Sequence, residues 1–341
     1  MTDPFVYRLR QSRARPPGQA GGRRAAPLYR AAVRQFEDLL EAAVATKPAG
    51  RPLPLFYALS QVGRGIAAAH GEAGDHVGHG LTCPLQSETA PLLYARVKPK
   101  VVKPQGQLEV EPKVRTAQGQ FQVVSSALNP PTFDQSIELG ACLASLPDFA
   151  QEPVLARWLP AVRVSPFDGS PLKTKDGGWA IGSYVDIKAS ELTIEAFQAQ
   201  LDKYPMAAQA QATVLSIPPH SRAFSGKPAY PEAPHVAWPT VGLGYQGAAP
   251  PYRREDYHWL RPGLTTTGET PTALMTWWLV LFTLSMIARY HPVAWVTALD
   301  PDKSPTATLL ERVMEEGLSA VPQLAYEAVV GHPCLVAVPE I

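Results

Sequence analysis

Arginine and histidine side chains recur at short spacing in the first quarter of the chain, and together these residue types can do acid–base chemistry on phosphates. Arg64 and His70 stand six positions apart near the end of a predicted helix. In metal-free RNA cleavage, an arginine holds the scissile phosphate while a histidine of near-neutral pKa moves protons at the 2′-hydroxyl or the leaving oxygen. Six helical steps place the two side chains about 120° apart, so they converge only if the helix ends near His70 or a dimer partner completes the site. The alternative is an arginine that pairs on the helix surface and an exposed terminal histidine.

A second group of side chains follows directly and contains metal-ligand types. His76, His79 and Cys83 lie at short spacing, with Asp75 and His70 nearby. A zinc site would need a fourth ligand, and the sequence offers neither that nor a second cysteine pair. We therefore expect a loop with incidental histidines and no bound metal. His79 stands out, either as a proton-transfer group or as a histidine whose hydrogen bonds order the loop.

Two further patterns bear on ligand binding. Residues 242–247 fit G-x-G-x-x-G, but that dinucleotide fingerprint must leave a strand and enter a helix, and here Pro250 and Pro251 follow at once. No phosphate loop, nucleophile elbow or kinase motif is visible, so no cofactor is expected. Arg289, at the end of a predicted apolar helix, can bind an anion or interact favourably with the negative end of the helix dipole.

Positive charge is concentrated at the N-terminus. The first 34 residues hold eight arginines, Arg23 and Arg24 among them, against Asp3 alone; this gives +7 there and, with a net charge of +1, leaves −6 for the remainder. A basic segment attracts phosphate-bearing partners, nucleic acid above all, through counterion release. The alternative is a solubilising terminus, since no aromatic residue interrupts Arg8 to Arg24 for base stacking.

Amphipathic patterns predict a helical hairpin near the N-terminus. Apolar residues fall on one helical face from Leu28 until Pro48 stops the run, and a second stripe extends from Pro54 to His70. Residues 1–26 include a stretch rich in Arg, Gly, Ala and Pro without an apolar period. We therefore expect a flexible arginine-rich arm there, whose removal leaves the fold intact.

The middle of the chain changes to short β-like runs between turn residues. These runs cover residues 92–97, 108–114 and 121–124, and a further pair at 158–164 and 179–187 brackets a Lys-Asp-Gly-Gly turn typical of a hairpin. Prolines recur from residue 218 to residue 262. We therefore expect a long connection without regular structure in that segment.

The strongest helical pattern comes last and carries no charge. Residues 272–288 span 17 positions and include Trp277 and Phe282. This is shorter than the roughly 20 residues of a membrane span, and the run also contains threonines and a serine. The pattern therefore predicts a helix buried in a protein core, with both aromatic side chains inside, and no membrane association.

Three strings carry a resemblance to a known family. Leu284-Ser285-Met286-Ile287-Ala288-Arg289-Tyr290 with Trp295 resembles the late helix of YaaC-like proteins, and Phe56-Tyr57-Ala58-Leu59-Ser60-Gln61 with Arg64, and His79-Gly80-Leu81, support the likeness. The resemblance covers residues 27–341, leaves residues 1–26 outside, and implies a bacterial, cytoplasmic protein without implying an activity. The spacing of Arg64 and His70 also resembles the Arg-x4-6-His signature of HEPN-type helical ribonucleases, although Gly65 replaces the polar residue that commonly follows the arginine.

These patterns together predict an α+β protein with a mainly helical core. The N-terminal helical hairpin packs with the C-terminal helices, and a small antiparallel β region is inserted between them. We expect one unit over residues 27–341, helical over 27–83 and 270–341 and mixed β and loop over 84–269. Three widely spaced cysteines and the absence of a signal-like apolar stretch favour a reducing compartment, the cytoplasm.

Two functional classes stay open at this stage. The first is a HEPN-like, RNA-directed protein that acts as a homodimeric, metal-independent ribonuclease with Arg64, His70 and His79 in its site. In this class Arg23, Arg24 and Arg289 bind anions or nucleic acid. The second is a non-catalytic binding or regulatory protein in which the same arginines and histidines are structural.

Overall fold

The chain divides into two compact units. In this computed structural model, described residues are 3–72, 78–84, 92–100, 119–128, 135–166, 172–173, 179–185, 194–207, 211–213, 235–240, 252–254, 257–265 and 268–331. The first unit comprises Met1–Leu143, Glu152–Arg157 and Pro271–Ile341, and the second comprises Ala144–Gln151 and Trp158–Thr270. Where the sequence patterns predict one unit over residues 27–341, the contacts of the chain form two groups, because the β-rich middle makes most of its contacts within itself.

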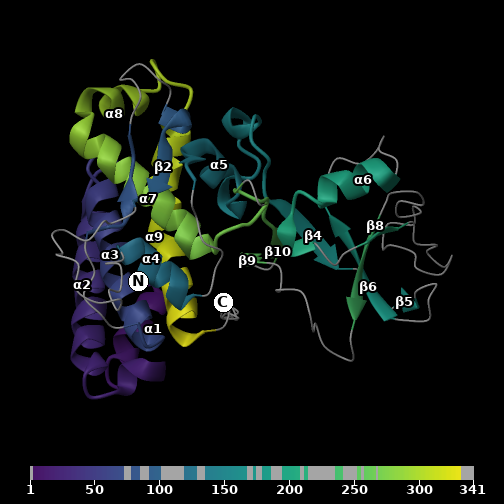
Figure 1. Cartoon of the computed structure of the whole chain (residues 1–341). Helices are drawn as coiled ribbons and strands as arrows, with labels where there is room; N and C mark the ends of the chain where they lie inside the picture. Colours follow the sequence, from purple (N-terminus) through teal and green to yellow (C-terminus); the bar gives the residue numbers. More distant parts are fainter. Residues whose placement is uncertain are drawn as a thin grey trace, which may run out of the picture. The chain divides into compact units, whose positions relative to one another are not determined.

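The first unit is built around the predicted helical hairpin. Helix α2 (Ala25–Ala45) and helix α3 (Pro52–Ala69) pack along their length, with Val33, Phe36 and Leu40 of α2 buried. Helix α3 also contacts two C-terminal helices, α7 (Ala273–Tyr290) and α9 (Ala307–Val330), while α8 (Pro292–Ala298) follows α7 (Figure 1). The expected packing of the N-terminal hairpin with the C-terminal helices is confirmed.

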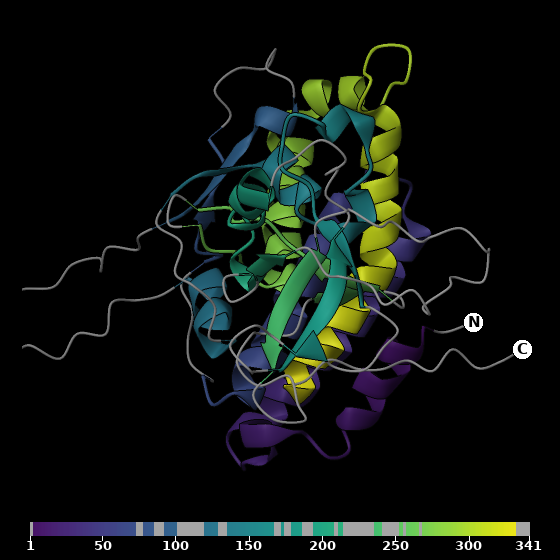
Figure 2. The same cartoon turned by 90° about the vertical axis from the view of Figure 1, so that its right-hand side faces the viewer.

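Helix α7 forms the centre of this core. Trp277 and Phe282 are 0% and 2% exposed, which confirms the prediction for both side chains. Among the described residues, α7 is the one helix long and apolar enough to cross a membrane by length and composition, and 78% of it is buried inside the protein. Helix α9 runs alongside it in the turned view (Figure 2). Gly63 of α3 permits a close approach, since a Cβ there would lie 2.4 Å from the ring of Trp278.

The N-terminal segment differs from the expected flexible arm. Residues Pro4–Ser12 form helix α1, capped by Asp3, whose carboxylate accepts hydrogen bonds from the backbone N–H groups of Phe5 (2.8 Å) and Val6 (3.2 Å). Phe5, Val6 and Leu9 are buried, and α1 packs against α2 and α9. A short 3-10 turn (Gly18–Gly21) then leads to α2. This short helix is amphipathic, but arginines and other polar residues surround its three apolar positions, so its apolar pattern is weak in the sequence.

Small β elements and helices complete the first unit. Strands β1 (Leu81–Thr82), β2 (Arg96–Pro99) and β3 (Ile137–Glu138) form an antiparallel sheet in the order β1-β2-β3. Helix α4 (Gln120–Ala127) occupies the run at 121–124 that was expected to be β, and α5 (Leu139–Ala144) follows β3. The expected run at 108–114 lies outside the described residues.

The described residues of the second unit contain a seven-stranded antiparallel sheet and an α-helix. The strands are β4 (Val162–Pro166), β5 (Leu172–Lys173), β6 (Trp179–Val185), β7 (Gln211–Thr213), β8 (His235–Thr240), β9 (Tyr252–Arg254) and β10 (Tyr257–Leu260), and the helix is α6 (Ile194–Leu201). Their order is β7-β8-β6-β4-β10-β9, with β5 paired to β6. The β4–β6 pair confirms the predicted hairpin, with Val164 opposite Val185.

Three of these strands overturn the expected connection without regular structure at residues 218–262. Strand β8 pairs with β6 even though Pro239 lies within it, opposite Ala180. Strands β9 and β10 pair with each other, and β10 continues the sheet through β4. Prolines therefore interrupt the sequence pattern here without preventing these strands from pairing.

Candidate functional site

The exposed side of helix α3 supplies the first two residues of the candidate site. Tyr57 and Arg64 are seven residues apart, which corresponds to two helical turns and places them on the same face. Tyr57 is half-buried and Arg64 is exposed, whereas their neighbour Phe56 points into the core and is 1% exposed. The helix thus presents one aromatic hydroxyl and one guanidinium on the same face, two turns apart.

His79 is positioned by its backbone rather than by its ring. The carbonyl groups of Gly78 and His79 accept hydrogen bonds from the first N–H groups of α4, those of Gln120 and Phe121, each at 3.1 Å. The Gly80 carbonyl accepts from the side-chain amide of Gln122 at 2.7 Å. The first N–H groups of a helix have no partner within the helix, and those of α4 bind the loop that carries His79.

Gly80 is required for this close docking. Its φ is +75°, a conformation that favours glycine, and a Cβ at this position would lie 2.9 Å from the Cα of Gly119. The His79-Gly80-Leu81 string, noted in the sequence for its family likeness, thus has a physical reason: the glycine lets the backbone pass against the start of α4.

A buried polar contact ties α4 to α3 and so fixes the loop relative to Tyr57 and Arg64. The Ser60 hydroxyl donates to Oε1 of Gln120 at 2.7 Å, and the side-chain amide of Gln120 donates to the Ser60 carbonyl. Both residues are buried, at 4% and 3% exposed. A reciprocal pair of this kind resists displacement, because separation would leave two polar groups unpaired in the core.

The ring of His79 sits among aromatic side chains. Its centroid lies 5.1 Å from that of Phe56, 6.1 Å from that of Tyr57 and 6.1 Å from that of Phe282. The ring is partly exposed, but its Nδ1 atom is buried and has no hydrogen-bond partner among the residues that the structure describes. Such an orphaned nitrogen is uncommon in a purely structural histidine.

Arg289, from the end of α7, completes the cluster. Its Nη2 donates a hydrogen bond to the Tyr57 hydroxyl at 2.8 Å. The guanidinium also lies over the rings of Tyr57 and Tyr290, at 5.6 and 5.5 Å from their centroids. These contacts orient Arg289 toward α3. Arg289 therefore does more than interact with the negative end of the α7 dipole.

The electrostatics of the four residues favour a neutral histidine. Burial lowers the pKa of His79 below its ordinary value, and the positive charges of Arg289 and Arg64 lower it further. The imidazole is therefore uncharged at neutral pH while two guanidinium groups stand close to it. We call Tyr57, Arg64, His79 and Arg289 the His79 cluster.

The other predicted residues lie elsewhere. His70 ends α3, is exposed, and its Nε2 lies 2.8 Å from the Ala328 carbonyl oxygen of α9. Arg23 and Arg24 are exposed directly before α2. Arg64 and Arg289 are near enough to His79 to lower its pKa, whereas His70 contacts α9. Tyr57 was not singled out from the sequence, although its seven-residue spacing from Arg64 was visible.

Cys83 follows strand β1 and is a partly buried thiol. Burial raises its pKa to about 11, and a hydrogen bond with Thr283 offsets only part of this effect. The thiol is therefore protonated at neutral pH and is a poor nucleophile or metal ligand. His76, Asp75 and the glycine motif at 242–247 lie outside the described residues. Within the part that is described, no three His, Cys, Asp or Glu side chains gather as a metal site.

Comparison with known proteins gives one match. A search of curated proteins and a search of solved structures found no match. The model of the YaaC-like protein family matches residues 7–329. The match begins within α1, inside the segment that was expected to lie outside the likeness, and so agrees with the packing of that helix. The chain therefore belongs to the YaaC-like protein family.

Proposed function

We propose that the His79 cluster binds a phosphate group of single-stranded RNA and cleaves the chain beside it without a metal ion. The observation that carries this proposal is the His79 ring 6.1 Å from that of Tyr57, whose hydroxyl accepts a hydrogen bond from Arg289; the positive charges of Arg289 and Arg64 also lower the pKa of the imidazole. Guanidinium groups bind phosphate oxygens through paired hydrogen bonds, and a neutral imidazole can accept a proton at neutral pH.

Each residue has a distinct role in this proposal. Arg64 is exposed and makes no ion pair with any residue that the structure describes, so its guanidinium is available to a phosphate. Arg289 is oriented by Tyr57 and supplies the second positive charge. Two guanidinium groups stabilise the charge that develops on the phosphate oxygens as the reaction proceeds.

His79 would act as the general base. The RNA 2′-oxygen forms a bond to phosphorus as its proton passes to the imidazole, and the bond between phosphorus and the 5′-oxygen breaks. The leaving oxygen takes a proton from solvent, and the products are a 2′,3′-cyclic phosphate and a 5′-hydroxyl end. Proton transfer by a positioned side chain accelerates such reactions by about 10²- to 10⁴-fold.

A second candidate function is binding of the same ligand without cleavage. One observation favours it: His79 is the only one of the four residues whose side-chain type titrates near neutral pH, so the cluster has one group suited to proton transfer. Efficient cleavage commonly uses one group to accept a proton and another to donate one. The two candidates share the phosphate ligand and differ in whether a product forms.

The test measures RNA binding and cleavage in the same samples. Wild-type protein is incubated with end-labelled single-stranded RNA in the presence of a chelator, and affinity is followed by fluorescence anisotropy. We expect His79→Gln to lower the cleavage rate at least 100-fold with little change in affinity. Arg64→Gln is expected to weaken binding and cleavage together, because the arginine contacts the phosphate itself.

The matched control is His70→Gln, which makes the same chemical change outside the cluster. It should leave cleavage unchanged, with thermal unfolding confirming that all variants are folded. RNA binding without product supports the second candidate. Cleavage that is lost in His70→Gln but retained in His79→Gln contradicts the assignment to this cluster, and wild-type protein that neither binds nor cleaves RNA refutes both candidates.

A further inference from the structure

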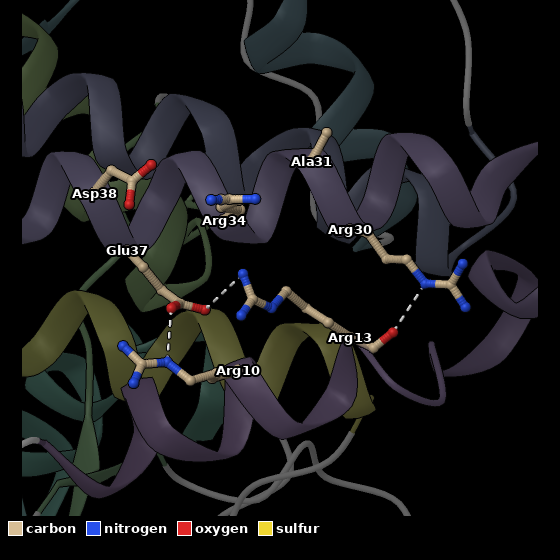
Figure 3. Close-up of a pocket in the computed structure, with 7 residues that line it drawn as sticks. All are labelled: Arg10, Arg13, Arg30, Ala31, Arg34, Glu37 and Asp38. Atoms are coloured by element: carbon tan, nitrogen blue, oxygen red, sulfur yellow. Dashed lines mark hydrogen bonds and ion pairs between the residues drawn. The ribbon is translucent and has the colours of Figure 1, made fainter.

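Four arginines converge on one open groove between α1 and α2. The groove encloses about 710 Å³ and is lined by Arg10, Arg13, Arg30, Ala31, Arg34, Glu37 and Asp38 (Figure 3). Four guanidinium groups against two carboxylates leave a charge of 4 − 2 = +2 on this lining. We refer to it as the α1–α2 groove; it shares no residue with the His79 cluster.

One carboxylate organises the α1 side of the groove. The side chain of Glu37 is only 9% exposed, and its oxygens lie 2.8 Å from Nε of Arg10 and 3.6 Å from Nη1 of Arg13. This single negative charge therefore holds two positive ones in place. The pairing fixes the two guanidinium groups at the groove while leaving them with excess positive charge.

The α2 side contributes two arginines with unused donors. Nε of Arg30 donates to the backbone carbonyl of Arg13 at 2.9 Å, which orients the guanidinium without neutralising it. Arg34 is exposed and makes no ion pair with any residue that the structure describes, although Asp38 stands one turn away on the same helix. Figure 3 shows Arg34 and Arg30 on the stretch of α2 that lines the groove.

The spacing of the two arginines on α2 works against the stability of that helix. Arg30 and Arg34 are four residues apart, so the pair places like charges on one helical face. Like charges at this spacing destabilise a helix. A bound anion would relieve this repulsion between Arg30 and Arg34.

The lining also restricts the class of ligand. Among the described residues that line it, Ala31 is the one apolar residue and none is aromatic, so this lining offers no surface for stacking a base or packing an apolar group. Its volume lies within the range of about 300–1,000 Å³ typical of sites that hold small molecules. Recognition must therefore depend on charge and on the geometry of guanidinium–phosphate hydrogen bonds.

We infer that the α1–α2 groove is a binding site for a ligand with several adjacent phosphate groups. Two sources share this chemistry: the backbone of a single-stranded nucleic acid and a free inorganic polyphosphate. The groove binds either through the unpaired donors of Arg30 and Arg34, while Arg10 and Arg13 add charge from the opposite wall. This site is a separate proposal from the His79 cluster and can fail without affecting it.

The test compares two variants of equal charge. Arg30→Gln/Arg34→Gln removes two charges from the groove, and Arg15→Gln/Lys47→Gln removes two charges from exposed positions outside it. Affinity for labelled single-stranded RNA and for tripolyphosphate is measured with the full chain over a range of salt concentrations. Both pairs are also placed in an Arg64→Gln background, so that phosphate binding at the His79 cluster does not mask the result.

The groove variant is expected to weaken binding at least tenfold and to lower the dependence of log affinity on log salt by about two. The control variant should retain most of the affinity. A loss for both ligands supports phosphate recognition as such, a loss for RNA alone identifies the nucleic acid backbone as the source, and a loss for tripolyphosphate alone identifies the free polyphosphate. Equal losses in both variants, or no loss in the groove variant for either ligand, overturn the inference.

Discussion

Leu9 provides a direct test of whether the arginine-rich N-terminus is part of the folded core. The side chain is 0% exposed, and α1, which carries it, packs against α2 and α9. Truncation of a fully buried leucine to alanine costs about 2–5 kcal/mol, because apolar contacts are lost and a cavity remains. We therefore expect Leu9→Ala to lower the free energy of unfolding by this amount, with each kcal/mol lowering the Tm by about 2–4 °C.

The measurement is thermal and urea unfolding followed by far-ultraviolet circular dichroism, which reports mainly on the helical unit. The matched control is Tyr7→Ala on the same helix, because Tyr7 is 53% exposed. Substitution of an exposed residue usually changes stability by less than about 0.5 kcal/mol. If Leu9→Ala is as mild as Tyr7→Ala, α1 does not pack in solution and the assignment of the N-terminus to the core is wrong.

Three further predictions concern α3 and the loop beside it. Gly63→Ala should destabilise the protein by about 1–3 kcal/mol in urea unfolding, because the new methyl group overlaps the Trp278 ring; a neutral effect would contradict that close approach. Ser60→Ala leaves Gln120 partly unpaired in the core and should cost about 1–3 kcal/mol, and a variant as stable as wild type would show that the contact is dispensable. The RNA cleavage rate should rise with pH through the lowered pKa of His79, below about 6.5, and then level off, since the neutral ring is the base; a rise that starts only above pH 7 would assign the base elsewhere.

The same pKa shift links His79 to stability. Burial and neighbouring positive charge lower its pKa in the folded state, so between that value and about 6.5 the unfolded chain binds the extra proton. Stability therefore falls as the pH drops through this window and is fully present above it. His79→Gln should remove this part of the pH dependence when unfolding is measured across the acidic range.

The helical elements could be predicted where their apolar pattern is long. The α2–α3 hairpin and α7 both carry an unbroken pattern over 17 or more residues, and the structure has them where the sequence places them. Helix α1 was missed because only three buried positions lie among its arginines and polar residues. Helix α4 was misassigned because Phe121, Val123 and Val124 have high β-propensity, and contacts with α3 and α7 outweigh it.

The candidate site shows a different limit. Arg64, His79 and Arg289 could each be selected from the sequence, by residue type or by their place in a family-like string. The placement of these three side chains in one region could not be predicted from the sequence. It depends on the packing of α3 against α7 and on the docking of the Gly80 loop at the start of α4. Strand β8 illustrates the same point in the second unit, since its pairing with β6 is a contact between distant segments.

The division of the helical unit between the two ends of the chain has a consequence for its biosynthesis. The α2–α3 hairpin is complete at Ala69, whereas its partner α7 begins at Ala273, roughly 200 residues later. At a typical rate of about 5–20 residues per second, translation of the intervening segment takes about 10–40 s. During this interval the apolar face of the hairpin is without α7 and α9, so its burial must wait until the C-terminal helices have been made.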